Sequence, residues 1–83
     1  MYYIIGTTFK IDSTNYKLIK KYAPLTEGTY KINYIKKNNN MVEYTVVSNL
    51  GKKFIINFNN CKEADNLLAT LRSERLPALE SNI

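Results

Sequence analysis

The sequence contains no histidine, no tryptophan and a single cysteine among its 83 residues. Without histidine, the most frequent general base and the most frequent metal ligand of enzymes are both missing, and no catalytic triad can be assembled. The one cysteine, Cys61, cannot form a disulfide within the chain, which predicts a reducing, cytoplasmic location. The three glycines stand apart from one another, so there is no glycine-rich phosphate loop. We therefore predict that the protein is not an enzyme and that it binds neither a metal nor a cofactor.

Long hydrophobic runs are also missing. The longest, 1–5, is far shorter than the roughly 20 residues that cross a bilayer, so we expect no membrane association. A chain of 83 residues is too short for a dinucleotide-binding fold or a barrel enzyme. We expect one small domain, 1–83, with a single core.

The charge is positive, with 12 lysines and arginines against 7 aspartates and glutamates, a net charge of +5. However, lysine, asparagine, isoleucine and tyrosine supply 37 of the 83 residues, and all four have A/T-rich codons. This composition is typical of AT-rich genomes such as those of phages and mobile elements. The positive charge is therefore weak support for an anionic ligand.

Alternating hydrophobic residues predict an antiparallel meander. The three clearest strands are 28–37, 41–48 and 53–58, which are joined by asparagine- and glycine-containing turns. Their alternation predicts a common inward face made by Tyr30, Ile32, Tyr34, Val42, Tyr44, Val46, Phe54, Ile56 and Phe58.

Two further segments are expected to join the sheet. The segment 2–11 alternates and predicts an opening strand. In 16–22, the spacing of Tyr16, Leu18 and Tyr22 favours another strand. A short helix is the alternative, because Leu18 and Tyr22 are also four residues apart and Asp12 or Ser13 could cap it.

After residue 60 the period changes to that of a helix. The apolar residues at i, i+3, i+4 and i+7 are Ala64, Leu67, Leu68 and Leu71. They predict an amphipathic helix over 61–75, capped by Asn60 and ended before Pro77, followed by a tail, 77–83. The leucine stripe is the surface that can cover the apolar face of the sheet.

Part of the sequence resembles the small SH3-like β-barrels, whose pattern can be written LTxGxxYxV…YxVxNxxG. The resemblance covers about 25–58 and lies in Leu25, Thr26, Gly28, Tyr30, Ile32, Tyr44, Val46, Asn49 and Gly51. It implies a partly open barrel of about five strands that binds a partner rather than catalysing a reaction. The expected fold class is thus α+β, mostly β: a curved meander or such a barrel, with one C-terminal helix.

Our first functional hypothesis is a small module that binds a larger protein partner, of the kind that serves phages or mobile elements as an accessory regulator. Opposite the predicted core, the outward face would carry an apolar row among lysines, which is typical of association sites. The residues expected to make the contact are Lys31, Ile35, Val47, Lys53 and Ile55.

The alternative hypothesis is a nucleic-acid-binding module, in which lysines follow phosphates while aromatic rings stack on bases. The candidates are Lys31, Lys36, Lys37, Lys52, Lys53, Tyr16 and Tyr22. Because 36–37 and 52–53 flank opposite hairpin tips, about 25 Å apart at the usual rise of a strand, they cannot form one compact patch.

Overall fold

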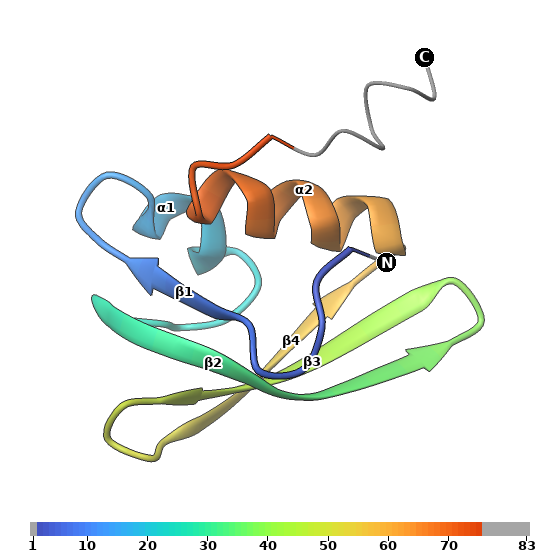
Figure 1. Ribbon diagram of the computed structural model, residues 1–83, viewed down its shortest axis with the longest axis horizontal. Coiled ribbons are helices and arrows are strands. Elements are labelled where there is room, and N and C mark those ends of the chain that lie inside the picture. Colours follow the sequence, from blue (N-terminus) through green and yellow to red (C-terminus); the bar gives the residue numbers. More distant parts are fainter. Residues whose placement is uncertain (1, 76–83) are drawn as a thin grey trace.

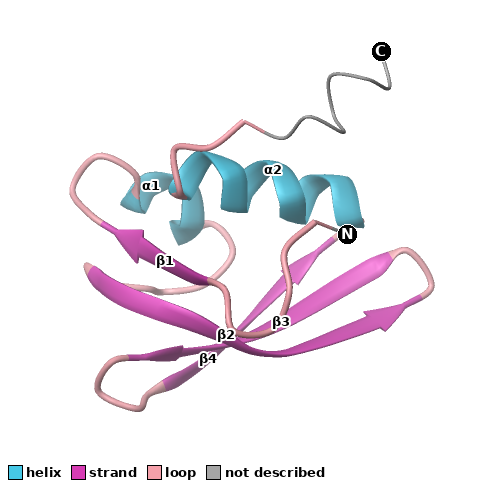
Figure 2. Ribbon diagram, viewed as in Figure 1, coloured by secondary structure: helices cyan, strands magenta, loops and turns pink. Residues whose placement is uncertain are grey.

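The computed structural model describes residues 2–75, which form four strands and two helices (Figure 1). In chain order they are β1 (Thr8–Ile11), α1 (Tyr16–Lys20), β2 (Gly28–Asn38), β3 (Met41–Ser48), β4 (Lys53–Phe58) and α2 (Cys61–Leu71). The strands form an antiparallel sheet in the order β1-β2-β3-β4. Both helices lie over one face of this sheet, and none of the described elements covers the other face (Figure 2).

The coarse class, α+β with a mostly β meander, is confirmed, but the finer prediction of a five-stranded barrel is wrong. The sheet has four strands, and β1 and β4 are its two separate edges, so it does not close. The fifth expected strand is α1, and the opening strand has only four residues.

The segment 16–22 begins with a helix because the preceding turn nucleates one. The carboxylate of Asp12 accepts hydrogen bonds from the backbone N–H groups of Thr14 and Asn15, at 2.9 and 3.0 Å. This turn holds the chain in a helical path, and the Tyr16 N–H donates to the Asp12 carbonyl at 3.0 Å. The side chain that α1 buries is Ile19, which the period-two interpretation had placed outward. The prediction of a strand here is wrong and the helical alternative is confirmed, but the N-cap is Asn15 rather than Asp12 or Ser13.

The opening strand is shorter than predicted because the chain turns at Gly6. The backbone there has φ of +98°, which glycine adopts without a steric penalty, and the Thr7 N–H closes the turn on the Ile4 carbonyl at 3.1 Å. Only Thr8–Ile11 pairs with β2, against Gly28–Lys31. The preceding residues leave the sheet and run toward α2 (Figure 1).

A β-bulge changes the phase of β2. Ile32 faces Val46, but the next pair is Tyr34 with Thr45, so Asn33 has no cross-strand partner. After the bulge, each side chain of β2 lies on the face opposite to the one that strict alternation predicts. Tyr34 is 55% exposed and Ile35 packs against the core, so the predictions of an inward Tyr34 and an outward Ile35 are both wrong.

The core lies between the inner face of the sheet and α2. Completely buried side chains from the sheet include Tyr44, Ile56 and Phe58, and Ala64 and Leu68 of α2 cover them. The predicted inward residues other than Tyr34 lie in this core or, for Phe54, pack against it. The leucine stripe therefore covers the sheet as its spacing predicts.

The start of α2 is as predicted and its end is not. The Asn60 side chain accepts a hydrogen bond from the Glu63 N–H at 2.8 Å, which confirms the cap. The helix ends at Leu71 because Ser73 adopts φ of +55°, and the Glu74 N–H donates to the Ala69 carbonyl at 2.7 Å. This Schellman motif stops the helix before the predicted limit of 75. The expected tail, 77–83, lies outside the described residues.

The bulge leads to a prediction about two tyrosines. Tyr34→Ala should change the free energy of unfolding by less than about 0.5 kcal/mol, as expected for an exposed side chain. Tyr44→Ala should lower it by about 3 to 5 kcal/mol, because it opens a cavity under α2. Urea denaturation followed by circular dichroism measures both variants. A loss of similar size in the two would show that the Tyr34 ring is buried and that the bulge is absent.

Candidate functional site

The face of the sheet that neither helix covers is called the outer face here (Figure 2). The cross-strand register arranges its side chains in three rows. The first row holds Thr8, Lys31, Val47 and Lys53, the second Tyr34, Thr45 and Ile55, and the third Lys36, Glu43 and Asn57. Its middle row has an exposed ring on β2 and an exposed isoleucine on β4, since Tyr34 and Ile55 are each 55% exposed.

The outer face is positively charged. It carries Lys10, Lys31, Lys36 and Lys53 against one acidic side chain, Glu43. Within residues 2–75, none of these lysines forms an ion pair. Lys31 and Lys53 both neighbour Val47 in the register and so stand about 10 Å apart, two strand spacings. The face thus presents apolar side chains between unneutralised cations.

Four of the five residues predicted for protein binding share this face. Lys31, Val47 and Lys53 lie side by side in its first row, and Ile55 lies in its second. Ile35 does not, because the bulge turns it to the inner side. Tyr34 takes its place on the outer face. The sequence carried no clear signal for this exchange, since a single extra residue in a strand has no composition of its own.

The residues predicted for nucleic-acid binding are only partly brought together. Lys31, Lys36 and Lys53 are on the outer face, but the Lys52 ammonium lies 5.4 Å from the centroid of the inward Phe54 ring. Lys37 pairs with the buried Val42 and so belongs to the inner side of the hairpin.

Both predicted stacking rings lie on the helical side of the sheet. Tyr16 is in α1, and Tyr22 follows α1 and packs on Phe58 with ring centroids 5.0 Å apart. The exposed ring that does stand among lysines is Tyr34, which sequence reasoning had placed in the core.

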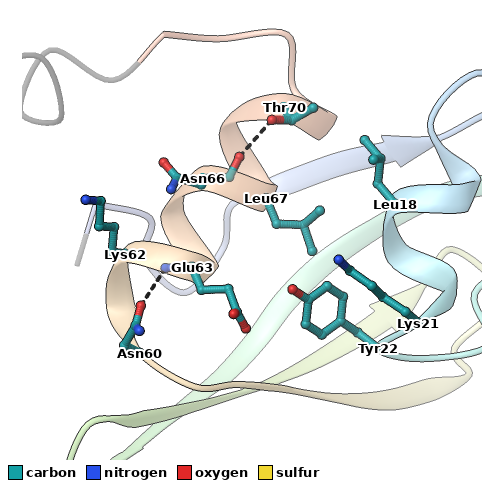
Figure 3. A pocket seen from close by; sticks show the side chains of 9 residues that line it. All are labelled: Leu18, Lys21, Tyr22, Asn60, Lys62, Glu63, Asn66, Leu67 and Thr70. Carbon is teal, nitrogen blue, oxygen red and sulfur yellow. Dashed lines mark hydrogen bonds between the residues drawn. The ribbon is translucent and has the colours of Figure 1, made fainter.

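A groove of about 420 Å³ lies between α1 and α2 (Figure 3). Its apolar lining comes from Leu18, Tyr22 and Leu67. Two of its polar side chains are used by α2 itself: Asn60 caps the helix, and the Thr70 hydroxyl donates to the Asn66 carbonyl at 2.9 Å. We interpret this groove as the seam between the two helices.

Groups that could support catalysis or metal binding are few. Residues 2–75 hold no cluster of three or more cysteine, aspartate and glutamate side chains able to bind a metal ion. Cys61 is half-buried in the first turn of α2 and packs against the core. Neither helix in the described part of the chain is long and apolar enough to cross a membrane.

A hydrogen-bonded cluster joins the N-terminal residues to the end of α2. The Tyr3 hydroxyl donates to a Glu74 carboxylate oxygen at 2.7 Å, and the Arg72 guanidinium donates to the same oxygen at 2.9 Å. Arg72 also donates to the Thr8 carbonyl of β1. The hydrogen bonds from Arg72 and Tyr3 lower the pKa of Glu74 below its ordinary value. Burial, and then the bond to Glu74, raises the pKa of Tyr3 above its ordinary value.

No protein-family model, curated protein or solved structure matches the chain. The resemblance to SH3-like barrels therefore stays a prediction.

The Tyr3 cluster predicts how stability depends on alkaline pH. The ordinary pKa of tyrosine is 10.0, and that of Tyr3 is raised in the folded state. Its contribution to stability is therefore complete below pH 10 and is lost as pH rises toward the higher, folded-state value. Urea denaturation from pH 8 to 11 should show a fall in unfolding free energy above pH 10 that is less steep in Tyr3→Phe. Ile55→Val, which changes an exposed side chain without a titratable group, serves as the control and should keep the original slope. An unchanged slope in Tyr3→Phe would contradict the cluster.

Proposed function

We propose that the protein is a non-enzymatic interaction module of the cytoplasm that binds an acidic surface of a larger protein through its outer face. The observation that carries the proposal is an uncovered sheet face that joins Tyr34, Val47 and Ile55 to unpaired lysines. We propose that its role is accessory and regulatory.

The apolar part of the face supports association with a protein. Tyr34 and Ile55 are on the same cross-strand row, with Thr45 between them, and Val47 is two residues along β3 on the same side. Such a contiguous strip on an otherwise polar surface is typical of protein-protein contacts, where aromatic side chains are enriched and the rim is charged. The strip would form the centre of the contact.

The charges indicate the kind of partner. Lys31 and Lys53 flank Val47, and Lys36 lies in the third row on the far side of Tyr34. A partner surface with acidic side chains around an apolar centre would match this arrangement, raising the association rate and fixing the orientation. A basic partner would be repelled.

This proposal predicts that acidic residues in the strip abolish binding. The double variant Val47→Asp and Ile55→Asp should reduce capture of the partner from a lysate of the source cells by about tenfold or more, because it removes apolar contact and adds negative charge that repels an acidic partner. The matched control is Leu50→Asp, which changes an equally apolar side chain, 91% exposed, in the β3–β4 turn. Quantitative pull-down, with circular dichroism to check folding, measures the effect.

The same experiment includes a nuclease treatment. Capture that survives nuclease and is lost in the double variant supports a protein partner. Equal capture by the double variant and the Leu50→Asp control would exclude the outer face as the contact.

A second candidate function rests on the exposed ring of Tyr34. This ring lies on the same face as Lys31 and Lys36, in the row between theirs. An aromatic side chain on a lysine-bearing sheet is the arrangement that stacks a base and holds the neighbouring phosphates in many single-strand-binding domains. We propose single-stranded nucleic acid as the alternative ligand of this face.

The alternative predicts a strong dependence on salt. Affinity for a fluorescent oligothymidylate should fall linearly on a log-log plot against salt concentration, with a slope of about −2 to −3 if three or four lysines contact phosphates of a single strand. Tyr34→Ala should weaken binding without changing that slope, because stacking displaces no counterions. Fluorescence anisotropy measures both quantities, and no binding at low salt would eliminate this alternative.

A further inference from the structure

The strand β2 has an edge that is only partly paired. β1 pairs with Gly28–Lys31, and two more backbone bonds reach Ile32: the Gly6 N–H donates to its carbonyl at 2.7 Å, and its own N–H donates to the Thr7 carbonyl at 2.8 Å. From 33 to 38, β2 pairs with β3 on one side, and none of the described strands lies on the other. This free edge is where another strand could be added.

The bulge decides which backbone groups point to the free edge. Along an antiparallel strand, the N–H and C=O groups of successive residues point to alternate edges of the strand. Those of Ile32 point toward β1. The extra residue at Asn33 shifts the alternation by one, so Ile35 and Lys37 aim their N–H and C=O groups away from β3. The β2–β3 hairpin supports this assignment. Asn38 and Met41 flank its two-residue turn, and the pair at that position exchanges backbone hydrogen bonds, so Asn38 points toward β3. Two residues thus offer a full set of donors and acceptors at the edge.

An apolar hollow lies beside this edge. Tyr3, Ile4, Ile5 and Ile35 line about 440 Å³ of open space. Ile4 is 70% exposed and Ile5 is 55% exposed, although both are large aliphatic residues. The turn at Gly6, just before β1, thus leaves two isoleucines beside the unpaired half of β2. Aliphatic side chains gathered around unpaired backbone are typical of a site that receives a strand.

The geometry points to an extended segment of a partner protein as the occupant, and we propose that it adds to β2 as an antiparallel strand. Opposite Ile35 it would place an apolar side chain in the hollow, and opposite Lys37 an acidic one. On the opposite face of the added strand, its side chains would lie beside Tyr34 and Lys36. The segment would therefore read, from its N-terminus, acidic, acidic, apolar, apolar.

Charge argues against a second copy of this chain in that place. The protein carries a net charge of +5, and two β2 edges paired around a two-fold axis would gather the Lys36 and Lys37 side chains of both copies at one seam. Like charges across a pair of strands are destabilising. An acidic segment neutralises the same lysines.

This site shares Tyr34 and Lys36 with the proposed contact on the outer face, but it depends on the edge backbone groups of Ile35 and Lys37 and on the hollow, and it does not include Val47 or Ile55. The Val47→Asp and Ile55→Asp variant should keep it intact. Failure of one proposal therefore leaves the other standing.

Two fluorescent eight-residue peptides of equal composition test the inference. One has the central order Glu-Glu-Val-Val and the other Val-Val-Glu-Glu, each with Ser-Thr before and Thr-Ser after. The first should bind more tightly, with a Kd below about 1 mM. Methylation of the backbone nitrogens of its first glutamate and first valine, the two that would donate to the edge, should weaken binding by about tenfold or more. Fluorescence anisotropy gives each Kd.

Protein variants complete the test. Ile5→Asp and Lys37→Glu should each weaken binding of the Glu-Glu-Val-Val peptide, whereas Leu50→Asp, an exposed apolar position far from the edge, should leave it unchanged. The inference is overturned if neither peptide binds, if the reversed peptide binds more tightly, or if methylation has no effect. Sedimentation equilibrium that shows a dimer disrupted by Ile5→Asp would also overturn it, because a second copy would then occupy the edge.

Discussion

The structure depends on one helix that covers one face of one sheet. In the described part of the chain, Leu68 and Ala64 of α2 are completely buried against the inner face, on which Tyr44, Ile56 and Phe58 lie. A sheet of four strands has two faces, and this helical layer is enough for one of them. None of the described elements covers the outer face. It mixes lysines with the exposed side chains of Tyr34 and Ile55.

The N-terminal residues complete the core and shorten the sheet at the same time. The backbone N–H of Tyr2 donates to the buried carboxylate of Asp65 at 3.0 Å, and the Tyr3 hydroxyl donates to Glu74. These bonds hold residues 2–5 over the inner face, next to α2. Residues held there cannot also extend β1 along β2. The free edge of β2 and the exposure of Ile4 and Ile5 are thus consequences of how the core is closed.

Regular alternation was enough to predict β3 and β4, and the side-chain cap at Asn60 was visible in the sequence. The errors come from features that interrupt a period. In 16–22 the alternation of Tyr16 and Leu18 hid Ile19, whose burial is decided by the Asp12 turn upstream. The bulge at Asn33 could not be predicted, because it is fixed by the distance between the Ile32 pairing and the hairpin turn, which is a property of two strands together. Alternation therefore placed Lys31, Val47, Lys53 and Ile55 on the face where the structure has them, but it exchanged Tyr34 with Ile35.

That exchange gives β2 two different surfaces. With strict alternation, Tyr34 would be buried with Ile32, and Ile35 would join Val47 and Ile55 on the outer face. The extra residue instead sends the aromatic ring outward, among the lysines, and turns Ile35 toward Ile4 and Ile5 at the edge. It also places the free N–H and C=O groups of Ile35 beside the hollow. The bulge shifts the alternation of the side chains and that of the backbone groups by the same one residue. One unpaired asparagine in the longest strand therefore determines both which side chains a partner would meet on the outer face and which backbone groups an added strand would meet at the edge.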